Sequence, residues 1–129
     1  MQQGVVTMPS VRLSEQARTA FEESLADARV RLNSRNFAAA WRALERAHIL
    51  GQSDAWLHFR SHASMLRCGI AELDLREAFG QVIRMALAIP SSALGRYPVG
   101  NTGRARVSLF RAMPLPAELE SLLSGDSPP

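Results

Sequence analysis

The chain contains three histidines, at positions 48, 58 and 62, and a glutamate at position 45. Glu45 precedes His48 by three residues, and His58 precedes His62 by four. On α-helices, residues with these spacings project from the same face. Imidazole nitrogens together with a carboxylate oxygen are a ligand set that suits zinc, iron or copper. The spacing therefore predicts a site for one transition-metal ion, formed by His48, His58, His62 and Glu45.

The two pairs are expected on consecutive helices. Only residues 51–53 separate these helices, and so short a connection favours an antiparallel hairpin. In a hairpin, residues that are equally far from the turn lie at the same depth. By this count His48 lies level with His58, and Glu45 lies level with His62, one helical turn deeper. All four side chains would then meet between the two helices.

The apolar periodicity predicts an all-α fold, with helices at residues 14–32, 36–51, 53–69, 73–89 and 116–123. We expect Gly51 and Pro90 to end the second and fourth helices, Ser53 to cap the third, and Trp56 to lie in the core. Short connections favour a four-helix antiparallel bundle or two stacked helical hairpins. The second arrangement agrees with the segment NFAAAWRALERAHILGQ, which resembles a tetratricopeptide hairpin.

The domain organisation follows from the same pattern. Residues 14–123 should form a single helical domain, in which the Pro/Gly-rich stretch 90–114 is an ordered loop. Residues 1–13 are expected to be a flexible arm and residues 124–129 a flexible tail. Two roles remain open for the loop around residues 100–103, GNTG. It either covers the pocket between the second and third helices or binds an anion through its backbone N–H groups.

The composition excludes several classes of function. All fifteen basic residues are arginines, so lysine Schiff-base chemistry is excluded. The net charge is only +3 and the arginines alternate with twelve acids, so nucleic-acid binding is not favoured. No run of apolar residues is long enough for a membrane span, and no secretory leader is readable. We therefore expect a cytoplasmic protein.

Readings without a metal ion remain open. His48 has the position of a residue that caps the carbonyl groups at a helix end, and Glu45 could pair with a nearby arginine, either Arg42 or Arg46. The alternative function is a helical-hairpin protein–protein interaction module. A metal site could serve storage, sensing or metal-assisted chemistry, with a small molecule or a protein as a further partner.

Several phrases in the chain, LERAHILGQ, REAFGQVIR and GRYPVGNTGRARVS, occur in an order that resembles a bacterial family catalogued as domain of unknown function 3703. The similarity spans residues 37–119. It implies a small, soluble and largely helical protein, and it implies no activity. The positions that fall on the recurrent phrases of the family are Glu45, His48, His58, His62, Gln81 and residues 100–103.

Overall fold

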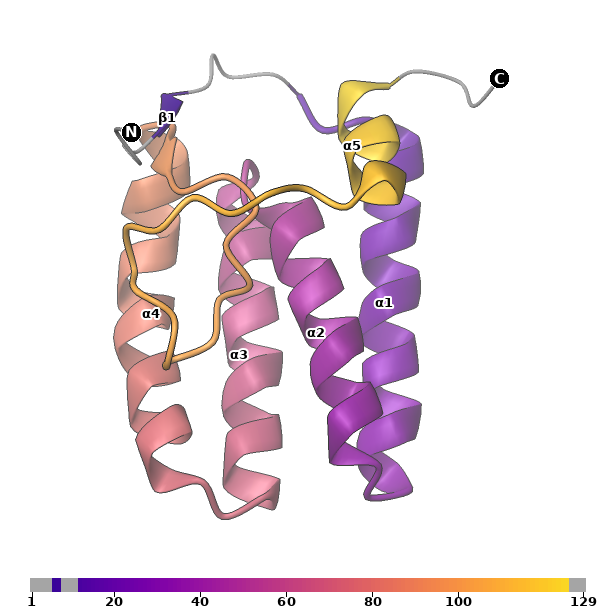
Figure 1. The fold of residues 1–129 in the computed structure, drawn as a ribbon, viewed down its shortest axis with the longest axis vertical. Helices are drawn as coiled ribbons and strands as arrows, with labels where there is room; N and C mark the ends of the chain where they lie inside the picture. The colour runs from indigo at the N-terminus through magenta and orange to yellow at the C-terminus, as the bar shows by residue number, and fades with distance from the viewer. Residues whose placement is uncertain (1–5, 8–11, 126–129) are drawn as a thin grey trace.

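The computed structural model describes residues 6–7 and 12–125 of the chain. Five helices dominate these residues, which confirms the all-α prediction, and the two strands have two residues each (Figure 1). In chain order the elements are β1 (Val6–Thr7), α1 (Glu15–Asn33), α2 (Phe37–Gly51), α3 (Ala55–Ala71), α4 (Leu75–Ala93), β2 (Arg96–Tyr97) and α5 (Ala117–Ser124).

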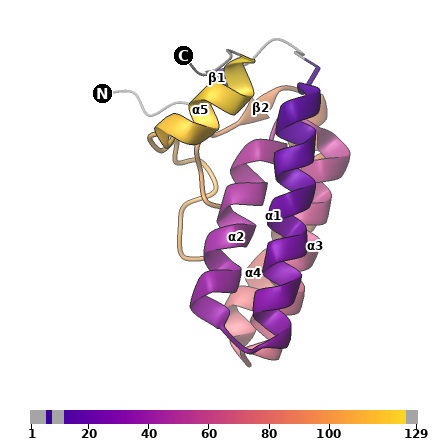
Figure 2. The ribbon, with the colours of Figure 1, turned by 90° about the vertical axis from the view of Figure 1, so that its right-hand side faces the viewer.

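The four long helices follow one another as two stacked hairpins. α1 packs against α2, α3 packs against α4, and α2 and α3 join the two pairs. Within the described residues α1 makes no contact with α4, although these two helices would be neighbours in a closed bundle. Figure 1 shows the resulting row of helices, and Figure 2 shows the segment after β2 running along one side of it. Of the two predicted arrangements, the stacked hairpins describe the packing better.

Side-chain caps begin the four long helices, because the first N–H groups of a helix have no partners within it. Ser14, Asn36, Asp54 and Asp74 each accept a hydrogen bond from a backbone N–H of the helix that follows. For α3 the cap is therefore Asp54, one residue later than the predicted Ser53. Its carboxylate accepts from two N–H groups, which makes it the stronger cap.

The prediction that Pro90 ends the fourth helix was wrong, because α4 continues to Ala93. Proline removes one helical hydrogen bond, but its fixed φ is compatible with a helix. Its own carbonyl still accepts from the N–H of Leu94 (3.0 Å), so the last turn closes. This extra turn has a consequence for the site, since it carries Ser92 to the side chain of His58.

The short strands tie the N-terminal segment to the end of α4. β1 pairs with β2 in antiparallel register, with Val6 opposite Tyr97 and Thr7 opposite Arg96. Part of the arm expected at residues 1–13 thus forms a strand. Residues 1–5 and 8–11 of that arm, and residues 126–129 of the expected tail, lie outside the described part of the chain.

The apolar core lies mainly between α1, α2 and α3. Phe21, Leu50 and Met65 are fully buried there. α2 ends at Gly51, as expected, although the φ of Gly51 is not positive. It is needed instead for close packing, because a Cβ at this position would lie 2.8 Å from Cε2 of Phe21. Trp56 was predicted in the core and is 61% exposed.

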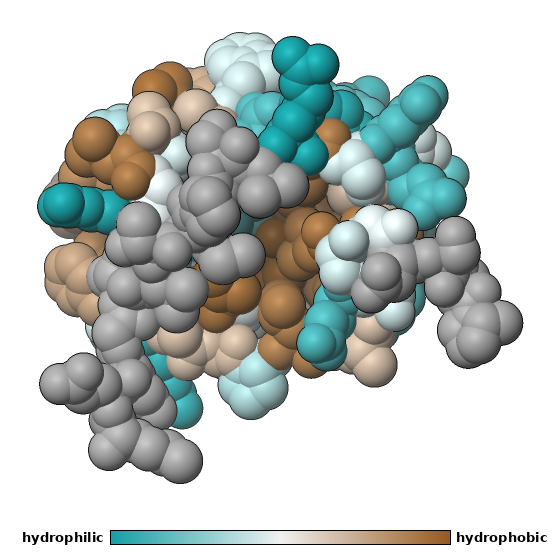
Figure 3. Space-filling model, turned by 90° about the horizontal axis from the view of Figure 1, so that it is seen from above, coloured by the Kyte–Doolittle hydropathy of each residue, from teal (hydrophilic) through white to brown (hydrophobic). Residues whose placement is uncertain are grey.

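The end of the molecule that carries α5 also presents apolar side chains, which gather at the centre of the view from above in Figure 3. α5 packs against α1 and α2 through the buried Leu119. Its Glu118 pairs with Arg46 of α2, which fixes the short helix to the hairpin. Among the described helices, none combines the length and the apolar character that crossing a membrane requires.

Candidate metal centre

The hairpin of α2 and α3 brings the three histidines together. His48 lies in the last turn of α2, and His58 and His62 lie in the N-terminal half of α3. Their side chains are buried, with exposed fractions of 2%, 6% and 3%. One ligand atom from each ring lies within 4.8 Å of the others, so the group is close enough to bind a metal ion. This convergence confirms the expectation that the three imidazoles meet between the second and third helices.

The hydrogen bonds at two of the rings identify which nitrogen carries the proton. Nδ1 of His48 lies 2.7 Å from the carbonyl oxygen of Asn101, which can only accept. Nδ1 of His58 lies 2.8 Å from the hydroxyl of Ser92. That hydroxyl donates its own hydrogen to the carbonyl of Gln52 (2.6 Å), so it accepts from His58. Both rings therefore carry hydrogen on Nδ1 and have a lone pair on Nε2.

The third ring is oriented in the same way through an amide. Nδ1 of His62 lies 2.7 Å from Oε1 of Gln81. The amide cannot be reversed, because its Nε2 donates to Oε1 of Glu77 (3.0 Å) and to the carbonyl of Gly103 (2.9 Å). His62 therefore also donates from Nδ1. Partners of this kind fix the tautomer and the direction of histidines that bind metal ions.

Two Nε2 lone pairs consequently face each other, since those of His58 and His62 are only 3.2 Å apart. A shared proton does not hold them together at neutral pH. Burial lowers the pKa of His58 to about 3 and that of His62 to about 4. Burial, followed by the neighbouring rings His62 and His58, also places the pKa of His48 well below its usual range. Three neutral imidazoles with their Nε2 atoms free of hydrogen are a group that could hold a cation.

The spacing is close to that of a tetrahedral metal site. Nitrogens that bind one zinc ion at 2.0–2.1 Å are separated by about 3.3 Å. The pair of His58 and His62 already has this separation, at 3.2 Å. The ligand atoms of the three rings lie within 4.8 Å of one another, so an inward movement of His48 by at most about 1.5 Å would complete three ligands. Three protein ligands leave one coordination position open.

The loop at residues 100–103 lies directly on the site. Asn101 supplies the carbonyl that holds His48, and Gly103 packs against the face of the same ring. Gly103 has a φ of +84°, and a Cβ there would lie 2.7 Å from Cδ2 of His48. Gly100 also has a positive φ, and a Cβ there would lie 2.0 Å from the carbonyl oxygen of Met113. Both glycines allow the loop to approach closely.

Replacing Gly103 by alanine should therefore disturb the metal site. The added methyl group is strained at positive φ and pushes on His48, so we expect at least a tenfold loss of zinc affinity. The free energy of unfolding should fall by about 1–3 kcal/mol. Gly125→Ala is the matched control, because Gly125 has a φ of +74° and open space around it. Equal zinc affinities of the two variants would contradict the role of Gly103.

The structure places Glu45 outside the histidine group. Its carboxylate pairs with Arg104, with Oε1 at 3.5 Å from the guanidinium nitrogen. Burial raises the pKa of Glu45, and Arg104 partly offsets this effect. Counting residues from the turn gives the depth of a side chain along the helix but not its direction around the helix axis. A residue three positions before His48 points about 60° away around that axis. The loop arginine occupies that direction.

A glutamine at position 45 should therefore leave metal binding nearly unchanged. Since the pair with Arg104 is part-exposed, we expect less than a threefold change in zinc affinity. Competition with a chromogenic chelator measures it. Glu22→Gln is a suitable control, because Glu22 forms a comparable pair with Arg60 on the far side of the hairpin. A loss of more than tenfold for the first variant alone would restore Glu45 as a ligand.

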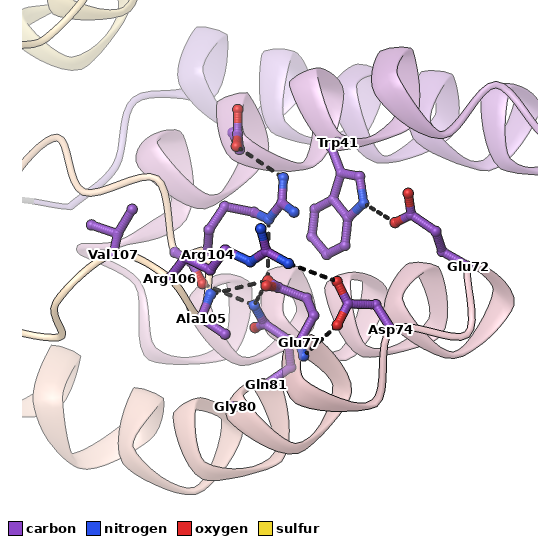
Figure 4. Close-up of polar contacts among 12 residues, drawn as sticks. Trp41, Glu72, Asp74, Glu77, Gly80, Gln81, Arg104, Ala105, Arg106 and Val107 are labelled. Carbon is purple, nitrogen blue, oxygen red and sulfur yellow. Dashed lines mark hydrogen bonds and ion pairs between the residues drawn. The ribbon is translucent and has the colours of Figure 1, made fainter.

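The buried carboxylate behind the site is Glu77, which is not among the four site residues predicted from the sequence. It is fully buried, and its Oε1 accepts from Gln81, from Nε of Arg104 (3.1 Å) and from the N–H of Ala105 (3.0 Å) (Figure 4). The guanidinium of Arg104 also stacks on Trp41, 3.7 Å from the ring centroid. Glu77 thus reaches His62 through Gln81. Counting residues from the turn between α3 and α4 places residues 80–81 at the same depth as His62. This count therefore indicates Gln81 as a neighbour of His62.

A cavity of about 620 Å³ opens beside the histidines, which line one of its walls. α4 and the loop after β2 provide the other walls. Two arginines, Arg84 and Arg96, are its only charged side chains among the described residues, and much of the remaining lining is apolar. A small molecule in this cavity would therefore contact the histidine rings.

Comparison with known proteins identifies a family. No curated protein and no solved structure matches the chain. The model of one protein family matches residues 15–123, from the start of α1 to the end of α5. This span includes the three histidines, Gln81 and the loop that carries Asn101 and Gly103. The chain therefore belongs to the family described as protein of unknown function (DUF3703).

Proposed function

We propose that the protein binds one transition-metal ion through Nε2 of His48, His58 and His62. The observation that supports this most directly is the 3.2 Å separation of two Nε2 atoms whose rings both carry their hydrogen on Nδ1. Without a cation, two buried lone pairs would face each other unsatisfied, which is unfavourable. A metal ion between them satisfies both and draws in the third ring.

The surroundings of the rings support a site that remains available for chemistry. Imidazole nitrogens suit zinc, iron or copper, and three neutral protein ligands with one open position are typical of catalytic zinc sites. The open position would face the cavity that the histidines line. We therefore favour metal-assisted binding or chemistry of a small molecule over storage in a closed cage.

Metal content tests this function. The protein is purified without a histidine tag, supplemented with zinc, and analysed by elemental mass spectrometry. We expect about one ion per chain, and none in a His58→Ala/His62→Ala variant that retains its helical circular dichroism. Protein that remains without metal after separate supplementation with zinc, iron and copper overturns the proposal.

A second candidate function, self-association, is favoured by the outer face of α4. Within the stack, α4 contacts α3 on one side only. Five of the large apolar side chains on α4, none of which lines the cavity, are 42–76% exposed: Leu75, Phe79, Val82, Ile83 and Ile89. By contrast, the exposed positions of α1, at the other end of the stack, are mostly charged or polar. A stack with one uncapped end can continue onto a second hairpin.

The occupant that fits this face is a second copy of the chain. Leu75, Phe79, Val82 and Ile89 are spaced by four, three and seven residues, which keeps them on one face and lets two helices pack along a seam. At roughly 100 Å² for each of the five side chains, two copies would bury about 1,000 Å², which is at the lower end of the range for specific interfaces.

Phe79→Asp should therefore convert a dimer into a monomer, as measured by light scattering over a range of protein concentrations. A charge at the centre of a desolvated apolar seam is strongly unfavourable. Leu73→Asp provides the control, because Leu73 is 83% exposed but lies in the turn before α4. A wild-type protein that is monomeric at every concentration would contradict self-association.

A further inference from the structure

The cavity beside the histidines has a charge distribution that identifies its ligand, provided that the proposed metal binding holds. Asp and Glu are absent from its lining in the described chain, whereas Arg84 and Arg96 are present. Arg96 is exposed at the rim, and Arg84 is only 9% exposed. A cavity of this kind favours an anion.

Arg84 is held in place by neutral groups. Its guanidinium donates to the carbonyls of Val107 (2.8 Å), Ala105 (3.4 Å) and Gly80 (3.3 Å). Among the described carboxylates, none forms an ion pair with it, and only the field of Glu77 partly offsets its charge. Glu77 itself already pairs with Arg104. Arg84 is therefore a nearly buried cation without a carboxylate partner. Burying such a charge is energetically unfavourable unless a ligand supplies the opposite charge.

The metal site requires an anion for the same reason. Three neutral imidazoles leave the whole charge of a divalent ion uncompensated. The positive charge of Arg84 acts on the same site, since Arg84 and the three histidines line the same cavity. Two cations that line one cavity repel each other. An anion between the ion and Arg84 removes this repulsion.

We infer that the cavity binds a small organic carboxylate with an apolar body, which ligates the metal ion and pairs with Arg84. Guanidinium groups match carboxylates by paired hydrogen bonds. The apolar part of the wall, which includes Leu87, Leu94 and Phe110, suits a hydrocarbon or aromatic body rather than a free inorganic anion. The volume of about 620 Å³ is that of an ordinary small-molecule site.

Benzoate is a suitable probe, and calorimetry with the zinc-loaded protein measures its affinity. Two analogues isolate the two parts of the ligand: benzyl alcohol lacks the charge, and inorganic phosphate lacks the apolar body. We expect benzoate to bind at least tenfold more tightly than either analogue. In cobalt-substituted protein, benzoate should also change the visible spectrum, because it enters the coordination sphere of the ion.

Single substitutions in the cavity test which side chains bind benzoate. Arg84→Gln should weaken benzoate binding by at least tenfold with zinc retained, whereas Arg96→Gln at the exposed rim should change it by less than threefold. Since Arg84 also holds the loop, Phe110→Ala is a second variant that does not alter these hydrogen bonds. It should weaken benzoate binding several-fold and leave zinc content unchanged, because Phe110 is 69% exposed.

The zinc content of the same samples separates the two proposals. Protein that retains zinc but binds benzoate no better than benzyl alcohol overturns this inference alone. Unchanged benzoate affinity in Arg84→Gln overturns it as well. Protein that binds no zinc overturns the proposed function, and this inference with it.

Discussion

Replacing His62 by alanine is expected to lower zinc affinity by a factor of about 10² to 10⁴. Structural zinc sites contribute about 10–16 kcal/mol in total, so one of three protein ligands accounts for about 3–5 kcal/mol. Among the three rings, the loss of His62 should lower zinc affinity the most, since its Nε2 faces that of His58 at 3.2 Å and its Nδ1 is held by Gln81. Competition with a chelator of known affinity measures the change.

The control for this variant lies on the same helix. Cys68 is fully buried on α3 but lies outside the histidine group, and burial raises the pKa of its thiol to about 11. Cys68→Ala should therefore disturb packing without changing zinc affinity. If both variants lost zinc to the same extent, the loss would reflect the fold, and His62 would not be a ligand.

The metal-free protein should be less stable by about 4 kcal/mol at pH 5 than at pH 7.5. The ordinary pKa of His58 and His62 is 6.5, and in the folded protein burial lowers it to about 3 and about 4. Between these values the unfolded chain binds more protons, so stability falls as the pH falls from 6.5 toward 4. Each of these two imidazoles contributes about 2 kcal/mol at pH 5, and His48 acts in the same direction.

Urea unfolding at a series of pH values measures this dependence. A His58→Gln/His62→Gln variant should show a flatter profile, because the two groups that take up protons on unfolding are absent. Zinc should shift the loss of stability to lower pH, since the ion binds only the folded protein with its neutral rings. An identical pH profile for wild type and variant would show that these imidazoles are not buried in the neutral form.

The part of the site that was predictable lies within one hairpin. His48, His58 and His62 occupy positions near a short turn, and helix geometry alone brings such positions to one depth. Glu45 shows where this reasoning ends. Its depth was suitable, but its direction around the helix and the presence of Arg104 decided its partner. Arg104 comes from a loop far along the chain, and no periodicity places it there.

The partners of the rings were beyond prediction for a similar reason. Asn101 belongs to the loop after β2, and Ser92 belongs to the helical turn that continues past Pro90. Proline usually marks a helix end, and packing of α4 on α3 overrides that preference. The placement of Ser92 beside His58 therefore depends on how two helices dock, not on the local sequence.

The order of residues along the chain determined the helices, the hairpin at residues 51–53 and the convergence of three imidazoles, because these features arise from contacts between neighbours in sequence. The tertiary structure alone decided which nitrogen of each ring is free, which carboxylate lies behind the site, and that a cavity with Arg84 opens beside it. Those features depend on α4 and the loop after β2, which reach the histidines only when the second hairpin packs against the first. Hydrogen bonds across such distances follow from the packing of whole elements, and spacing in the sequence does not encode them.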